Sequence, residues 1–295
     1  MSERMPTQPR LNTPAPGSRA LTRVLQRVLR ALGIYAWFKE ETFAYDVYRR
    51  LKDGRPLAWR SHEVRFYRDL LGPACDKALI FDVGANRGQR ADVFLRLGAR
   101  VVAVEPDSAS LRLLRRKYGG SSRRRAVAIV GAAVSDTVGR GTLRVASPGS
   151  GLNTLSEKWV RTLAENPGKL GARVEFPGIQ DVETTTLGAL MEIHGTPRYI
   201  KIDVEGHEAA VLRGLPRPVP FLSFEANLPE FLPEAAECVG ILMRLCPAGC
   251  FNLTEACYRG LALGEWAAGP EMVAALRARG ETSVEVFWRS EPARA

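Results

Sequence analysis

Residues 79–88 read LIFDVGANRG, and this stretch decides the fold. Its first half is a short apolar run, typical of a strand that is covered on both faces of a parallel sheet. The two glycines that follow let the backbone turn sharply and come close to a bound ligand. A helical pattern over residues 89–97 comes next and ends at Gly98, a residue type that often ends helices. Strand, glycine loop and helix in this order predict the first unit of a wound α/β sheet.

The same alternation continues along the chain and predicts a Rossmann-like α/β fold with helices on both faces of the sheet. A helix is expected over residues 108–118, and further strands over residues 101–104, 126–130, 199–202, 221–224 and 250–253. The last apolar run, residues 284–288, places Val284, Val286 and Trp288 on one face and is interpreted as an antiparallel edge strand. A long insertion, residues 135–197, separates the third and fourth sheet strands, and a hairpin is expected at residues 141–145.

Composition divides the chain into three parts. Hydrophobic residues make up 45% and charged residues 25%, which is typical of a globular protein. Residues 1–20 are rich in Pro, Ser and Thr and predict a disordered tail. Residues 21–75 predict a helical N-terminal extension, and residues 76–290 predict the α/β domain, with 146–183 as a variable insertion.

The charge and the targeting signals narrow the class of protein. The net charge is +10, and much of the excess lies in the first 60 residues. The helix expected from Leu21 has arginines opposite its apolar face, so it either lies on a membrane surface or packs on its own domain. No apolar run reaches the ~18 residues that span a bilayer, and no export signal is present. The five cysteines form no Cys-x-x-Cys pair, which argues against a zinc site. We therefore expect a cytoplasmic protein.

The glycine loop favours S-adenosylmethionine as the cofactor. A dinucleotide fingerprint reads Gly-x-Gly-x-x-Gly, whereas here Gly84 and Gly88 are separated by three residues that include Asn86. The loop follows Asp82, a carboxylate that would repel a pyrophosphate and attract ammonium and sulfonium groups. Glu105 ends the next strand, where an acidic residue accepts hydrogen bonds from ribose hydroxyls.

A second motif, YIKIDVEGHE at residues 199–208, brings charges to the fourth strand of the predicted sheet. Ligands of open α/β sheets bind outside the carboxyl ends of the strands, so Asp203 and Glu205 should point at the cofactor and the substrate. Lys201 lies inside the strand and needs a charged partner, for which Asp203 and Glu225 are the candidates. Glu225 ends the next strand and should face the same cleft, or it caps the segment that follows.

Four segments together resemble the FkbM-type family of S-adenosylmethionine-dependent methyltransferases: FDVGANRGQ, VEPD, AAVSD and YIKIDVEGHEAAVLRGL. The resemblance covers residues 78–228. It implies a seven-stranded class I methyltransferase fold with an antiparallel last strand. It also implies O-methylation of a hydroxyl on a natural product, a sugar or a lipid-linked glycan. The residues that it assigns to cofactor binding are Asp82, Gly84, Ala85, Asn86 and Gly88 in the loop, Glu105 at the ribose, Asp203, and Ala133 near the adenine.

The hypothesis for the chemistry is that Asp203 orients the cofactor and Glu205 contacts or deprotonates an acceptor hydroxyl. His207 is the second candidate for the base, and Lys201 completes the predicted catalytic group. Clustered carboxylates can hold Mg²⁺, but no dedicated ligand spacing is present, so no metal is expected.

The expected partner is a small-molecule or glycan hydroxyl acceptor, including polyketide-type natural products. Two alternatives stay open. The charge of +10 suggests a nucleic-acid methyltransferase, although the basic residues lie mainly in the N-terminal arm. The basic helix suggests a membrane-peripheral protein that binds the cofactor without catalysis.

Overall fold

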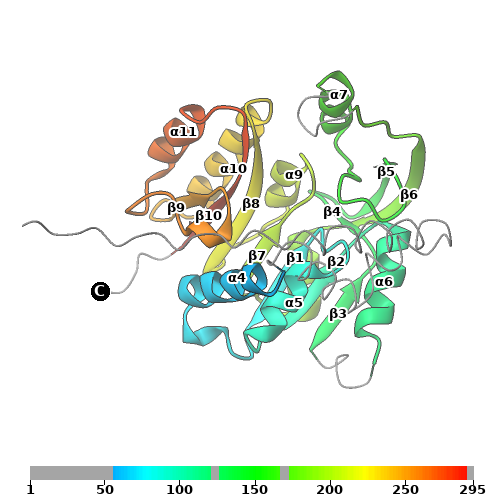
Figure 1. Ribbon diagram of the computed structural model, residues 1–295, viewed down its shortest axis with the longest axis horizontal. Helices are drawn as coiled ribbons and strands as arrows, with labels where there is room; N and C mark the ends of the chain where they lie inside the picture. The colour runs from blue at the N-terminus through cyan, green and yellow to red at the C-terminus, as the bar shows by residue number, and fades with distance from the viewer. Residues whose placement is uncertain (1–55, 121–125, 167–172, 291–295) are drawn as a thin grey trace, which may run out of the picture. The chain divides into compact units, whose positions relative to one another are not determined.

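The computed structural model describes residues 56–120, 126–166 and 173–290 (Figure 1). The predicted disordered tail, residues 1–20, and the basic helix expected from Leu21 lie outside the described residues. The described part of the predicted N-terminal extension holds helix α4 (Pro56–Leu71) and a short 3₁₀ helix, η1 (Pro73–Cys75). The chain divides into two units after His62, and the account below concerns the second unit, from Glu63 onward.

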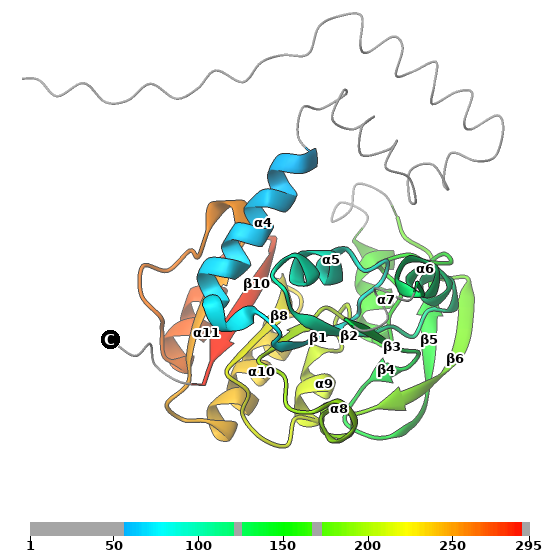
Figure 2. The same cartoon turned by 90° about the horizontal axis from the view of Figure 1, so that it is seen from below.

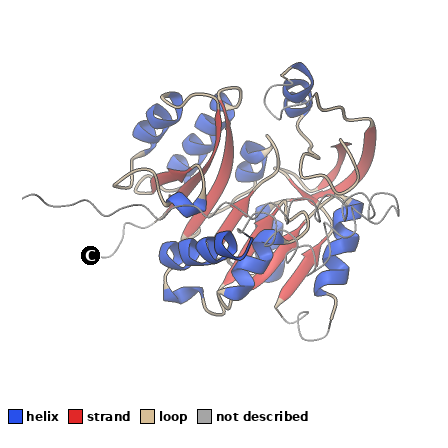
Figure 3. Ribbon diagram, viewed as in Figure 1, coloured by secondary structure: helices blue, strands red, loops and turns tan. Residues whose placement is uncertain are grey.

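A seven-stranded sheet forms the centre of this unit, in the order β3-β2-β1-β7-β8-β10-β9 (Figures 1 and 3). All neighbouring strands are parallel except β10, which runs antiparallel to both β8 and β9. The expected mostly parallel sheet with an antiparallel last strand is confirmed. The strands are β1 (Leu79–Val83), β2 (Arg100–Val104), β3 (Val127–Val130), β7 (Tyr199–Ile202), β8 (Phe221–Leu228), β9 (Cys250–Thr254) and β10 (Thr282–Arg289).

Helices cover both faces of the sheet, as Figure 2 shows. Side chains alternate along a strand, so Phe81 and Val83 of β1 pack into one core and Ile80 into the other. Each fully buried Phe or Leu contributes about 1.5–3 kcal/mol to this packing. The first core contains α8 (Leu187–His194), α9 (Glu208–Arg213), α10 (Leu232–Leu245) and α11 (Gly269–Arg277); the second contains α5 (Gln89–Arg96), α6 (Ser108–Tyr118) and the C-terminal part of α4.

The interpretation of residues 284–288 as an edge strand is wrong. These residues belong to β10, which pairs with β8 on one side and with β9 on the other, so β9 is the edge. The alternation of Val284, Val286 and Trp288 reports which face of the strand is buried. It carries no information on how many neighbours the backbone has.

The hairpin expected at residues 141–145 is also wrong. This segment lies in β5 (Gly139–Val145), which pairs antiparallel with the distant β6 (Gly178–Thr185) in a second, three-stranded sheet with β4 (Ala133–Val134). Helix α7 (Glu157–Glu165) lies between β5 and β6 in the chain. Short-range turn signals cannot show that the partner of a strand lies on the far side of an inserted helix.

None of the described helices combines the length and the apolar composition that crossing a membrane requires.

Candidate active site

A pocket lies outside the carboxyl ends of β1, β2 and β7, where ligands of open α/β sheets bind. The apolar part of its wall includes Ala132, Val134 and Leu143. Of the residues predicted for the site, it is lined by Gly84, Asn86, Glu105, Ala133, Asp203, Glu205 and His207. The other four predicted residues, Asp82, Ala85, Gly88 and Lys201, are not among its lining residues.

Gly84 allows the glycine loop to pass against the end of β7. Its backbone has a φ of 80°, and a Cβ atom there would lie 1.8 Å from the carbonyl oxygen of Asp203. The backbone N–H groups of Gly84 and Ala85 both donate to the carbonyl of Val104, at 3.0 Å each. The loop is therefore held against two neighbouring strands, and no side chain fits at residue 84.

Glu105 connects the loop to the end of β2. One carboxylate oxygen accepts a hydrogen bond from the Asn86 N–H at 2.7 Å, and the other accepts one from the Asp107 N–H at 2.7 Å. Each oxygen retains a further lone pair for a ligand hydroxyl. Burial raises the pKa of Glu105 to about 7. The side chain lines the pocket, so it is available to a diol such as a ribose.

Asp82 and Gly88 support the loop from the protein interior. Asp82 is buried, and its Oδ2 atom has no hydrogen-bond partner among the described residues. Burial raises the pKa of Asp82 to about 6. Gly88 has a φ of 71° and accepts a 2.8 Å hydrogen bond from the hydroxyl of Tyr118. A Cβ atom at residue 88 would overlap that hydroxyl, at 2.7 Å.

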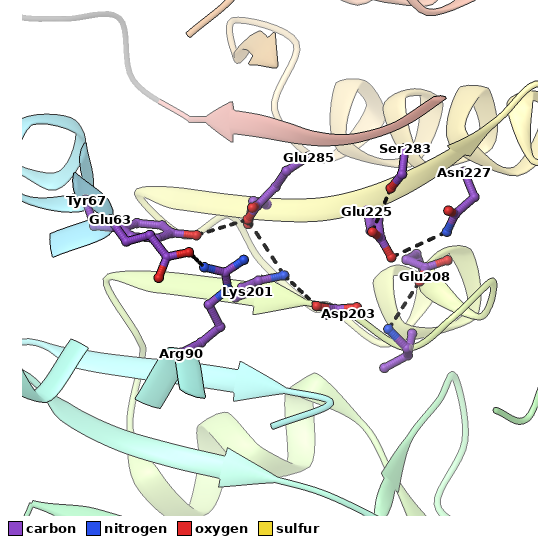
Figure 4. A network of polar contacts seen from close by, with 12 residues as sticks. Glu63, Tyr67, Arg90, Lys201, Asp203, Glu208, Glu225, Asn227, Ser283 and Glu285 are labelled. Atoms are coloured by element: carbon purple, nitrogen blue, oxygen red, sulfur yellow. Dashed lines mark hydrogen bonds and ion pairs between the residues drawn. The ribbon is translucent and has the colours of Figure 1, made fainter. Parts of the chain in front are cut away.

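Lys201 is enclosed by acidic groups from two strands (Figure 4). Its ammonium nitrogen lies 3.0 Å from Oδ2 of Asp203 and 3.8 Å from Oε1 of Glu285. The Lys201 side chain is 3% exposed, whereas Asp203 is 36% exposed and lines the pocket. Burial lowers the pKa of Lys201, but the two carboxylates outweigh it and raise the pKa above its usual value. The expected partner Asp203 is found, and Glu285 of β10 is a partner that sequence reasoning missed.

Glu205 stands on a tight turn that follows β7. Its φ of 55° lies in the left-handed region, and its backbone carbonyl accepts a 2.8 Å hydrogen bond from the hydroxyl of Thr154. Glu208 closes the turn, because one of its oxygens accepts hydrogen bonds from the N–H groups of Val204 and Gly206, both at 3.2 Å. The turn fixes the backbone from which the Glu205 side chain reaches the pocket.

Glu225 of β8 lies beside Asp203 and Glu205, but it is not among the residues that line the pocket. One carboxyl oxygen from each of the three lies within 4.8 Å of the others. The Ser283 hydroxyl donates to Glu225 at 2.7 Å. Burial, together with the charge of Asp203, raises the pKa of Glu225 to about 7. Burial and the two neighbouring carboxylates raise the pKa of Glu205 well above its usual value.

His207 is the N-cap residue of α9 and lines the same pocket. Its Nε2 atom lies 3.0 Å from the hydroxyl oxygen of Ser135. Burial lowers the pKa of this imidazole, so the neutral form predominates at neutral pH. The ring nitrogen in contact with Ser135 is thus already engaged in a hydrogen bond.

One wall of the pocket comes from the insertion, which sequence reasoning left unassigned. Asp107 holds this wall, because its oxygens accept hydrogen bonds from the Gly149 N–H at 3.1 Å and the Asn153 amide at 3.2 Å. The Gly/Ser/Pro-rich composition near residue 150 was the available signal, since such loops often carry binding groups. The insertion residues in the lining are Ser150, Gly151, Asn153, Thr154 and Leu155.

Comparison with known proteins assigns the family. The sequence profile described as "Methyltransferase FkbM domain" matches residues 82–240, more than half of the chain. The chain belongs to the FkbM methyltransferase family. No curated protein matches the sequence of this FkbM methyltransferase.

Solved structures are only distantly similar to this chain. A TehB-like S-adenosylmethionine-dependent methyltransferase from Corynebacterium glutamicum is 9% identical, with a TM-score of 0.40, over 92% of this chain and 100% of that one. An S-adenosylmethionine-dependent O-methyltransferase from Thermotoga maritima is 11% identical, with a TM-score of 0.39, over 85% and 72%. A precorrin-6y C5,15-methyltransferase from Geobacter metallireducens is 12% identical, with a TM-score of 0.36, over 79% and 87%. Similarities this distant carry no argument about the substrate.

S-adenosylmethionine is the cofactor of this FkbM methyltransferase, and the pocket suits it chemically. Gly84 lines the pocket, and the loop packs so closely on the end of β7 there that a Cβ would overlap the Asp203 carbonyl. Glu105 offers carboxylate oxygens suited to ribose hydroxyls, and Ala133 and its neighbours offer an apolar wall suited to an adenine ring. Asp203 offers a negative charge suited to an ammonium group.

Proposed function

We propose that this methyltransferase transfers a methyl group to a hydroxyl of a sugar, a glycan or a polyketide-type natural product. The observation that carries the proposal is the carboxyl group of Glu205 beside Asp203 and Glu225 at the edge of the pocket. An alcohol is a poor nucleophile until its proton is removed, and the raised pKa of Glu205 makes its carboxylate a stronger base for that step.

The role of each residue in this proposal follows from its position in the site. Bound S-adenosylmethionine supplies an electrophilic methyl group on a positively charged sulfur. Glu105 holds the ribose hydroxyls, and Asp203, ionised because Lys201 lies beside it, holds the ammonium group. Glu205 accepts the proton of the acceptor hydroxyl. His207 is the second candidate for this role, although its Nε2 contact with Ser135 makes it the less available base.

The polar groups around Glu205 suit a hydroxyl acceptor. Glu225, with a pKa of about 7, is present both as a neutral acid that donates a hydrogen bond and as an anion that accepts one. Hydroxyl groups of sugars and polyketides also donate and accept. Because Glu225 beside Glu205 can both donate and accept a hydrogen bond, it supports a hydroxyl group as the methyl acceptor.

The test is a methyl-transfer assay with isotopically labelled S-adenosylmethionine and a panel of hydroxylated sugars, glycans and polyketides. With an acceptor that is methylated, Glu205→Gln should lower kcat by about 10²–10⁴-fold, because general-base catalysis contributes that much. The dissociation constant for S-adenosylmethionine should stay unchanged. Glu183→Gln, the same change at a side chain that is 70% exposed, is the matched control and should keep full activity.

Full turnover by Glu205→Gln with normal cofactor affinity would show that Glu205 is not the base. The assay is run with and without EDTA, because the proposed mechanism needs no metal ion. Activity that is lost with EDTA and restored by Mg²⁺ would contradict that part of the proposal.

A further inference from the structure

Glu285 is an acidic residue in the interior, far in sequence from every motif of the site. It lies on β10 and is paired in register with Glu225. Its Oε1 atom accepts hydrogen bonds from the hydroxyls of Ser223 at 2.6 Å and Tyr67 at 3.3 Å. The Tyr199 hydroxyl lies 3.4 Å from the same atom and 2.5 Å from the Ser223 oxygen. The Glu285 side chain is 12% exposed, and these hydroxyls and Lys201 are the polar partners of its carboxylate.

The same oxygen shares Lys201 with Asp203 (Figure 4). One ammonium group therefore stands between two carboxylates, and the three side chains together carry a charge of minus one. If Glu285 were neutral, Lys201 would compensate Asp203 completely. Asp203, which lines the pocket, therefore keeps excess negative charge, because Glu285 neutralises part of the positive charge of Lys201.

We propose that Glu285 is a positioning residue that makes the pocket favour the cationic cofactor over its neutral product. The inference rests on the proposed function, in which Asp203 faces the cofactor. S-adenosylmethionine carries an ammonium, a carboxylate and a sulfonium group, and its net charge is plus one. S-adenosylhomocysteine lacks the sulfonium charge and is neutral overall. A pocket with excess negative charge therefore attracts the first more strongly than the second.

The neighbouring groups leave this charge balance in place. Arg90 of α5 forms an ion pair with Glu63 of α4 and also interacts with Glu285, and counting Arg90 and Glu63 together leaves the net charge of the group at minus one. Burial raises the pKa values of Tyr67, Tyr199 and Cys257 and keeps these groups neutral. The remaining groups that face the three side chains are acids, and they add negative charge where they are ionised: Asp82 of β1, Glu205 after β7 and Glu225 of β8.

The experiment measures the dissociation constants of both ligands by calorimetry with the full chain at pH 7.5. Glu285→Gln keeps the shape of the side chain and removes its charge. The preference for S-adenosylmethionine over S-adenosylhomocysteine should fall by about three- to tenfold, as expected for one charge at short range in a partly solvated site. Tyr67→Phe is the matched control, because it removes one hydrogen bond to the same oxygen and no charge. Its preference should equal that of the wild type.

A second variant separates charge from shape. Glu285→Asp shortens the side chain and keeps its negative charge, so its preference for S-adenosylmethionine should stay above that of Glu285→Gln. Circular dichroism checks the fold of each variant. If Glu285→Gln does not fold, Glu285→Ala serves, and its preference should fall by the same amount, about three- to tenfold.

Three results would overturn the inference: an unchanged preference in Glu285→Gln, an equal loss of affinity for both ligands, or a preference in Glu285→Asp that falls as far as in Glu285→Gln. Where Glu285→Ala is used instead, an unchanged preference in that variant would overturn it as well. These results concern binding only. Failure of the proposed base would appear instead as full turnover by Glu205→Gln, so the two failures are distinguishable.

Discussion

At the scale of single residues, the account depends most on backbone positions where no side chain fits. Gly84 is the sharpest case, because its φ of 80° and the 1.8 Å distance from a Cβ atom to the Asp203 carbonyl both require glycine. A residue with a side chain costs about 1–2 kcal/mol in this backbone conformation, before any overlap is counted. The loop would have to move away from the end of β7, and with it the edge of the pocket.

Gly84→Ala should therefore lower the free energy of unfolding by at least 2 kcal/mol and weaken S-adenosylmethionine binding by more than about tenfold. Thermal unfolding and calorimetry measure the two effects. Gly120→Ala is the matched control, because no atom lies within 4 Å of a Cβ there. Wild-type binding by Gly84→Ala would mean that the loop does not shape the cofactor site.

The carboxyl groups of the site predict an unusual dependence of stability on pH. Burial raises the pKa of Glu208 to about 8 and that of Glu105 to about 7. A carboxyl whose pKa is higher in the folded state than in the unfolded state favours folding while it is protonated. Its contribution is complete below the unfolded-state pKa and is lost as the pH rises through the folded-state value. Each such group lowers stability by up to about 1.4 kcal/mol per pH unit in that window.

The melting temperature of the ligand-free protein should therefore fall as the pH rises from 5 to 8.5. Glu208→Gln mimics the protonated form, so the decline should be shallower in this variant. Glu183→Gln changes an exposed side chain and should show the wild-type slope. A melting temperature that rises over this interval would show that the buried carboxyls are ionised in the folded protein without cost.

Much of the site could be read from local sequence, because its main residues follow strands directly. A residue that ends a parallel strand must lie at the carboxyl edge of the sheet, which is why Glu105, Asp203 and Glu205 are brought together at one pocket. Glu285 could not be found in this way. It lies inside an antiparallel strand, and only the pairing of β10 with β8 brings it near Lys201.

At the scale of elements, the regular core was predictable and the insertion was not. The expected bounds of β1, α6 and β7 agree with the structure, since short apolar runs and amphipathic periods are local signals. The order of β4, β6 and β5 in the second sheet depends on contacts between distant segments. For that reason the prediction of a hairpin at residues 141–145 is wrong. The loop that forms one wall of the pocket, residues 150–155, belongs to this insertion.

Asn153 tests whether the insertion contributes to cofactor binding. Its amide donates to Asp107 and to the carbonyl of Ser147, and its oxygen accepts from the Ala146 N–H at 3.0 Å. Asn153→Ala removes all three bonds on an element outside the main sheet. Affinity for S-adenosylmethionine should fall about five- to tenfold, because the wall loses its attachment to Asp107. The melting temperature should fall as well, because a hydrogen bond to a charged group contributes about 1.5–3 kcal/mol to stability.

The matched control is Asn166→Ala, at the end of α7. It should leave cofactor affinity unchanged. If both variants bind S-adenosylmethionine like the wild type, the insertion wall does not contact the cofactor, and its function lies with the acceptor or elsewhere.

At the scale of the whole molecule, the fold places three kinds of group around one pocket. The glycine loop and Glu105 come from the first two strands along the chain, Asp203 and Glu205 follow β7, and the wall at Asn153 comes from the segment between β5 and α7. The antiparallel β10 adds Glu285 from the opposite end of the sequence. The proposed chemistry needs all of them, because methyl transfer depends mainly on alignment of the reacting atoms.

The most direct measurement of this account is a crystal structure of the protein with S-adenosylhomocysteine. The account predicts that the ribose hydroxyls contact the Glu105 carboxylate, that the amino group lies at Asp203, and that the sulfur faces the side of the pocket where Glu205 stands. A ligand bound outside this pocket would contradict the account, as would a Glu205 carboxylate on the side of the cofactor away from its sulfur.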